Sequence, residues 1–130
     1  MAAEPTAPHL PRPAIIEAYG QGGFRLAGDA GNLSHRGSLL CLPDGIWAWP
    51  VTQREDVTKA ALAAVFERYS SIDIFLLGAG KDPWPLPEAL RVQFQESGIS
   101  ADAMTTGAAV STWNILLGEG RRVAAGLIAV

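Results

Sequence analysis

The most constraining feature of this sequence is a change in its hydrophobic pattern near residue 57. Before that point, short apolar segments are separated by turn signals such as Pro43-Asp44-Gly45, a pattern typical of antiparallel strands. After it, Leu62–Tyr69 has the spacing of an amphipathic helix, and helix-like and strand-like segments then alternate. Such alternation favours parallel strands joined by crossover helices. The two halves predict one α/β domain with a mixed sheet, an antiparallel N-terminal hairpin region and about three helices.

The individual elements follow from the same pattern. The polar, glycine-bearing segment 28–36 is expected to be a loop. Near the middle of the third helix, Asn114 follows Trp113, and we expect its amide to bond a neighbouring loop, because a buried amide must be paired. Strands are predicted at 14–19, 24–28, 38–42, 46–51, 72–77 and 123–130, with a short strand or an extended link at 99–104. Helices are predicted from near Thr58, from near Pro87 and from Thr105 or Thr106.

The N-terminal segment differs in composition from the rest of the chain. Residues 1–13 contain four prolines, which predicts a disordered tail there and a single folded domain over residues 14–130. The start lacks the basic and apolar segments of a secretory signal. The longest apolar run, Val123–Val130, is well short of the ~18 residues of a membrane span. We therefore expect a cytoplasmic protein without membrane insertion.

Charge and residue types exclude several classes of function. Ten basic residues against 13 acidic ones give a net charge of −3, which argues against nucleic-acid binding. The single cysteine, Cys41, lies between two leucines and is expected to be a buried, unreactive thiol. His9 and His35 have no further ligand at metal-binding spacing, and Ser34-His35 lacks an orienting acid. The sequence therefore predicts no metal, no cofactor and no catalytic residues.

Two short segments could together hold a small anion. The loop Gly78–Asp82 is not a phosphate-binding P-loop, since one residue separates its glycines and Asp82 stands where a hydroxyl is required. The loop nevertheless follows a strand, at the end where open α/β sheets bind ligands. The start of the third helix offers free N–H groups, as well as ordinary capping. The candidate ligand-binding residues are Gly78, Gly80, Lys81, Thr105, Thr106 and Gly107.

Tryptophan is abundant for a chain of this length. There are four tryptophans but only two tyrosines. Large aromatic side chains fill cores, and outside a core they favour protein interfaces. Both alternatives stay open for Trp47, Trp49 and Trp84, which are the candidate interface residues. Self-association is a further possibility compatible with either alternative.

Nearly the whole predicted domain, about residues 14–130, resembles a known family, and the most specific match lies near its C-terminal end. Residues 105–128 read TTGAAVSTWNILLGEGRRVAAGLI, and Thr106, Trp113-Asn114 and Arg121-Arg122 stand at positions that match the family's pattern. The family consists of small α/β domains (the Mth938 type) and includes the mitochondrial assembly factor 3 of respiratory complex I. Many relatives carry Cys-Arg after the paired alanines, whereas this chain has Val110-Ser111. A role that depends on that arginine is therefore not carried over.

The resemblance implies a fold and suggests a function. It implies a three-layer domain with a mixed central sheet and no established catalytic activity. It suggests a role in assembling a respiratory complex, with subunits of that complex as partners. Our leading hypothesis is a non-enzymatic protein-binding or assembly factor. The alternative is a binder of a small anionic ligand, or a cryptic enzyme, that uses the glycine loop and the helix start.

Overall fold

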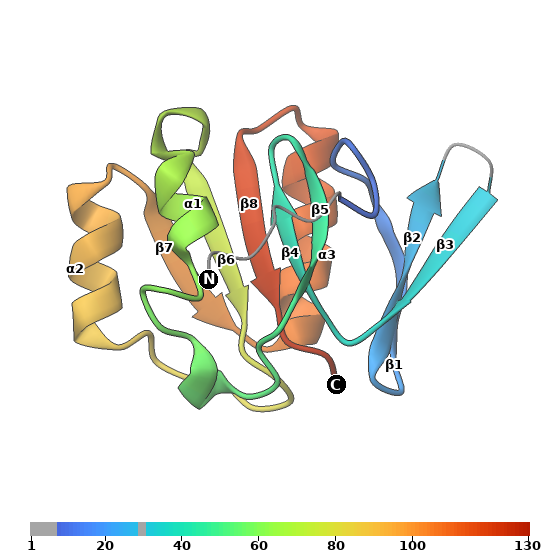
Figure 1. The fold of residues 1–130 in the computed structure, drawn as a ribbon, viewed down its shortest axis with the longest axis horizontal. Coiled ribbons are helices and arrows are strands. Elements are labelled where there is room, and N and C mark those ends of the chain that lie inside the picture. The colour runs from blue at the N-terminus through green and yellow to red at the C-terminus, as the bar shows by residue number, and fades with distance from the viewer. Residues whose placement is uncertain (1–7, 29–30) are drawn as a thin grey trace, which may run out of the picture.

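The chain forms two β-sheets and three α-helices in a computed structural model that describes residues 8–28 and 31–130 (Figure 1). The smaller sheet is antiparallel, with strand order β1-β2-β3. Its β1–β2 turn carries Gln21 and Gly22 with positive φ, a backbone conformation that glycine favours. The strands are β1 (Ile16–Gly20), β2 (Gly23–Gly28) and β3 (Gly31–Arg36).

The larger sheet is mixed, as the sequence predicts. Its order is β5-β4-β8-β6-β7, so that β8 lies at the centre. The hairpin β4–β5 pairs with β8 in antiparallel fashion, whereas β6 runs parallel to both β8 and β7. The strands are β4 (Ser38–Leu42), β5 (Gly45–Trp49), β6 (Ile74–Gly78), β7 (Ser100–Met104) and β8 (Val123–Leu127).

Helices cover both faces of the larger sheet. α1 and α2 pack on one face, and α3 packs on the other, where it also contacts β1 (Figure 1). The side chain of Thr105 caps α3 by accepting a hydrogen bond from Ala108 N at 3.3 Å. The predicted α/β fold with a mixed central sheet is thus confirmed. The helices are α1 (Ala63–Glu67), α2 (Glu88–Glu96) and α3 (Thr106–Gly118), with 3₁₀ turns at Arg54–Asp56 and Tyr69–Ser71.

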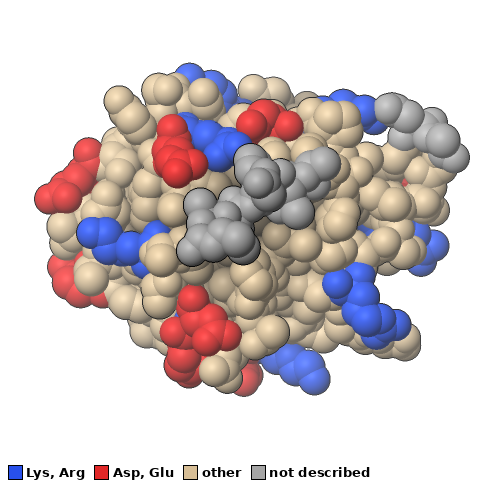
Figure 2. Space-filling model, in the orientation of Figure 1, with Lys and Arg blue, Asp and Glu red and all other residues tan. Residues whose placement is uncertain are grey.

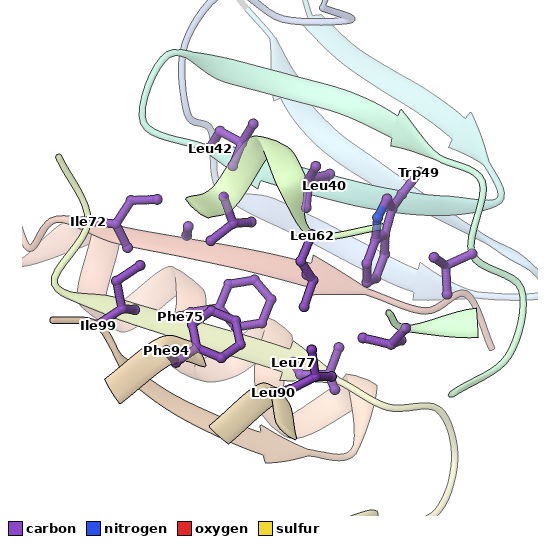
Figure 3. Close-up of a cluster of buried hydrophobic side chains, with 14 of the residues drawn as sticks. Leu40, Leu42, Trp49, Leu62, Ile72, Phe75, Leu77, Leu90, Phe94 and Ile99 are labelled. Carbon is purple, nitrogen blue, oxygen red and sulfur yellow. The ribbon is translucent and has the colours of Figure 1, made fainter. Parts of the chain in front are cut away.

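Two apolar clusters, one on each face of the larger sheet, form the core. Phe75 and Leu77 of β6 point toward α1 and α2, and the rings of Phe75 and Phe94 stack with centroids 4.9 Å apart (Figure 3). Leu76, between them, points to the opposite side and packs in the cluster that contains Trp113 of α3. This alternation explains the continuously apolar sequence of β6, which is buried on both faces.

Three segments differ from the sequence prediction. The predicted loop 28–36 contains strand β3, whose polar side chains reflect its exposed position at a sheet edge. The helix predicted from near Thr58 is shorter, because residues 58–62 form turns and α1 begins only at Ala63. Residues 1–7 of the predicted tail lie outside the described residues. Residues 8–13 pack on the domain, since Leu10 is 8% exposed and bridges Ile46 of β5.

The helices are also short relative to a lipid bilayer. None that the structure describes combines the length and apolar character needed to cross a membrane.

Candidate functional site

The structure brings the two predicted anion-binding segments together. Thr106 N, at the start of α3, donates a hydrogen bond to Gly80 O at 2.9 Å. Gly80 N in turn donates to the hydroxyl of Thr106 at 3.1 Å. A Cβ on Gly78 would lie 3.0 Å from Thr106 Cα, so the end of β6 touches the helix start. The glycine loop and the helix start therefore lie in contact.

The polar groups at this edge are, however, bound to one another. Thr106 is fully buried, and its hydroxyl donates to Ile128 O at 2.7 Å. The hydroxyl of Thr105 caps its own helix, and Lys81 is exposed to solvent. A Cβ on Gly107 would collide with the hydroxyl of Tyr19, which reaches over the helix start. These contacts give the residues a structural role, and their binding of an anion stays a prediction.

The three candidate interface tryptophans lie on the α1 side of the larger sheet. Trp49 is 5% exposed, donates from Nε1 to Ala61 O at 2.9 Å, and packs its ring over Gly126, where a Cβ would lie 2.7 Å from the indole. It is therefore a core residue and offers little surface to a partner. Trp47 and Trp84 are half-buried against the same cluster, so only their outer parts reach the surface.

Arginines cover the outer parts of those two half-buried tryptophans. The Arg68 guanidinium lies 5.4 Å from the ring centroid of Trp47 and pairs with Asp44 at 2.7 Å. This hydrogen bond holds the pKa of the Asp44 carboxyl below its ordinary value. Arg54 lies 6.0 Å from the Trp84 centroid and donates to Pro83 O at 3.2 Å. The function of these tryptophans as an interface stays a prediction.

The motif that carries the family resemblance joins α3 to the two sheets. Trp113 is fully buried and donates from Nε1 to Ala14 O at 2.9 Å. Asn114 bonds Ile16 twice, accepting from its N–H at 2.9 Å and donating to its carbonyl at 2.8 Å. The partner of Asn114 is therefore a strand backbone, not the expected loop. Arg122 pairs with Asp73 at 2.7 Å, and this contact lowers the pKa of the Asp73 carboxyl.

A groove of about 620 Å³, which the sequence pattern does not predict, lies along the smaller sheet. On the outer face of this sheet, register places Ala18, Arg25 and Ser34 in one row across the strands. Gly20, Gly23 and Arg36 form the next row. We call these six residues the arginine face. All six line the groove.

Burial shifts the pKa values of His35 and Cys41. His35 lines the groove, and its ring lies 4.6 Å from that of His9. Partial burial, followed by the neighbouring histidine, lowers the pKa of His35, although a hydrogen bond from Nε2 to Ser38 O at 3.2 Å opposes this. Burial raises the pKa of the Cys41 thiol far above its ordinary value. Within residues 8–28 and 31–130, no three His, Cys, Asp or Glu side chains gather as metal ligands would.

Comparison with known proteins identifies the family. Residues 16–128 match the model of a family described as a protein of unknown function, DUF498/DUF598. The chain belongs to this family. An uncharacterised protein from Rhodobacter capsulatus is 38% identical over 87% of this chain and 82% of its own length. The mouse NADH dehydrogenase [ubiquinone] 1 alpha subcomplex assembly factor 3 is 26% identical over 92% of this chain. The match spans only 62% of that mouse protein.

Solved structures agree with this assignment. A Bartonella henselae protein, described as an outer membrane protein, has a TM-score of 0.87 and 47% identity over 94% of this chain and 99% of its own. A Rhodopseudomonas palustris protein has a TM-score of 0.82 and 47% identity over 100% of this chain and 93% of its own. A Bordetella pertussis Mth938-like domain, at 22% identity and a TM-score of 0.75, covers 99% of this chain and 92% of its own and shows the fold alone. The resemblance stated from the sequence is confirmed.

Proposed function

We propose that this protein is a non-enzymatic factor that binds partner proteins and helps to assemble a membrane-associated respiratory complex. The observation that carries the proposal is the relationship to assembly factor 3 over 92% of this chain. The family motif accounts for the shared fold, because Trp113, Asn114 and Arg122 bond Ala14, Ile16 and Asp73. By analogy with those relatives, the proposed partners are subunits of NADH:ubiquinone oxidoreductase.

Deletion of the gene in the native host tests the proposal. We expect less assembled NADH:ubiquinone oxidoreductase on native gels, while the other respiratory complexes keep their normal amounts. Affinity capture with the tagged protein should recover subunits of the same complex. A deletion strain with a normal amount of this complex, together with capture that recovers none of its subunits, would overturn the proposal.

Binding of a small anion at the glycine loop is the competing function, and a ligand screen separates the two. Anions that bind the native state at concentrations far above their Kd raise the stability by a few kcal/mol. Phosphate, nucleotides and dicarboxylates are suitable probes. We expect no shift in Tm, because Thr106, Gly80 and Ile128 already bond one another at this edge. A shift that Lys81→Ala abolishes would favour the anion-binding function instead.

We also propose that the protein acts in the cytoplasm. Its one cysteine, Cys41, is a buried free thiol, as suits a reducing compartment. The Bartonella henselae relative, in contrast, is described as an outer membrane protein. Cell fractionation with antibody detection distinguishes the two locations, and recovery in the outer-membrane fraction would contradict the proposal.

A further inference from the structure

The arginine face presents two cations on a floor of small residues. Arg25 lies on β2 between Ala18 of β1 and Ser34 of β3. In the next row, Arg36 of β3 lies opposite Gly23 of β2. On one face of a sheet, side chains in such diagonal positions lie about 7–8 Å apart. Small neighbours leave space for both guanidinium groups to lie along the groove.

Neither of these two arginines forms an ion pair with a carboxylate among the residues that the structure describes. Both are exposed, and the Arg36 guanidinium makes one long contact, 3.5 Å to Gln21 O. Among residues 8–28 and 31–130, no ion pair or hydrogen bond engages the side chain of Arg25. No carboxylate stands among the described residues that line the groove. Guanidinium groups bind carboxylates well, because their paired N–H donors match two oxygens.

Acidic and basic side chains are distributed differently over the two sheets on the visible surface. In Figure 2, red and blue groups mix over the part of the molecule formed by the larger sheet and its helices. Over the part formed by the smaller sheet, on the right in the same orientation, the described residues show blue groups and almost no red. An acidic partner would therefore be attracted to this side of the molecule.

The smaller sheet also has one edge that is available for pairing. At the β1 edge, the Asn114 amide occupies both backbone groups of Ile16, in the way a neighbouring strand would. At the opposite edge, β3 pairs only with β2 among the strands that the structure describes. An edge strand with free backbone groups accepts an extended segment as an additional strand. The sheet can therefore grow at β3 but not at the Ile16 end of β1.

We propose that an extended acidic segment of a partner protein adds as a strand to the edge of β3 and places its carboxylates on Arg25 and Arg36. Alternate residues of such a strand would lie beside Ser34 and Arg36 on the outer face. Ser34 is small, so Arg25 reaches across it toward the added strand. The groove is open along the sheet, which suits a polypeptide better than an enclosed small molecule. This inference rests on the proposed protein-binding function and names the surface and chemistry that serve it.

A peptide-binding experiment tests the inference. The probe is a fluorescein-labelled peptide of about eight residues with alternating Val and Glu, which matches the usual length and period of a strand. We expect it to bind the full chain, and we expect the double variant Arg25→Glu/Arg36→Glu to bind it at least about tenfold more weakly. The matched control is Lys59→Glu, an exposed charge reversal beside α1, which should leave binding within about twofold because screening weakens distant charges.

Two further measurements separate strand addition from simple charge attraction. A peptide N-methylated at alternate residues keeps its charge but loses backbone donors, and we expect it to bind much more weakly. In NMR spectra, peptide binding should slow exchange of amide protons in Gly31–Arg36 and shift their signals. Equal binding of the N-methylated peptide, or signal changes confined to other strands, would contradict the inference.

Several other results would overturn the proposed strand addition at β3. Failure of the alternating Val/Glu peptide to bind the wild-type chain at low salt would overturn the inference. It would also be overturned if Lys59→Glu weakened peptide binding as much as Arg25→Glu/Arg36→Glu does. Peptide-independent dimerisation that Arg25→Glu/Arg36→Glu abolishes would assign the face to a second copy of this chain and also overturn it. If that double variant still captures respiratory-complex subunits from the native host, the inference fails while the proposed function stands.

Discussion

Replacement of Asn114 by leucine tests how the smaller sheet is attached to the rest of the domain. The Asn114 amide makes two hydrogen bonds to Ile16, of 2.9 and 2.8 Å, across 98 residues of sequence. Leucine has a similar size but neither donor nor acceptor, so both backbone groups of Ile16 lose their partner. The perturbation therefore removes the polar attachment and leaves the packing of α3 largely intact.

The expected loss of stability follows from the two hydrogen bonds that Asn114 makes. Each hydrogen bond contributes about 1 kcal/mol, and an unpaired, partly buried backbone group costs about the same or more. We expect Asn114→Leu to lower the free energy of unfolding by about 2–3 kcal/mol. At this chain length, each kcal/mol corresponds to roughly 3–5 °C, so Tm should fall by about 6–15 °C. Asn114→Asp, which keeps the acceptor for Ile16 N–H but not the donor, should also be destabilising.

Urea unfolding followed by tryptophan fluorescence gives the stability, and hydrogen exchange gives the location of the change. The Ile16 amide should lose protection in Asn114→Leu, while amides of β6 change only with global stability. The control is Ser111→Ala, on the exposed side of the same helix, which should stay within about 0.5 kcal/mol of the wild type. A loss of less than about 0.5 kcal/mol for Asn114→Leu, or unchanged protection of Ile16, would refute the reasoning.

Three other predictions concern Thr106, Cys41 and His35. Thr106→Val, which removes the hydroxyl bonded to Gly80 N and Ile128 O, should lower the unfolding free energy by about 1–3 kcal/mol, and Thr106→Ser should restore most of it in urea titrations. Cys41 should react with a thiol reagent only as fast as the chain opens, since its thiol is buried and its pKa is raised, and fast reaction in native buffer would contradict this. The pKa of His35 is lowered in the folded state, so its contribution to stability is present above about pH 6.5 and is lost as the pH falls through the folded-state pKa. His35→Gln should reduce the change of the urea midpoint between about pH 7.5 and 5. An unchanged pH dependence would contradict this role of His35.

The sequence predicted best those elements that depend on local pattern. The apolar run before Gly78 predicts a strand buried on both faces, and β6 has that burial. The sequence also singled out the loop after β6 and the start of α3 as segments that could act together, and the structure places them in contact, with Gly80 bonded to Thr106. These predictions need only hydrophobic period, turn residues and chain direction.

The arginine face could not be predicted in the same way, because it depends on pairing between strands. Segment 28–36 contains few strand-forming residues, so its sequence predicts a loop, and a loop gives Arg36 no defined neighbours. One weak signal was available, since Leu33 and His35 alternate with polar residues as in a half-buried strand. The contact of Tyr19 with Gly107 is equally invisible in sequence, because it joins residues far apart in the chain.

The central position of β8 has a consequence for synthesis on the ribosome. β8 is hydrogen-bonded to both β4 and β6, yet it follows every other strand in the sequence. While the nascent chain lacks Val123–Leu127, the β4–β5 hairpin and the β6–β7 unit have no shared neighbour and expose pairing edges on unburied apolar surface. Such species are prone to aggregate, so a translational pause before this strand would prolong the dependence on chaperones.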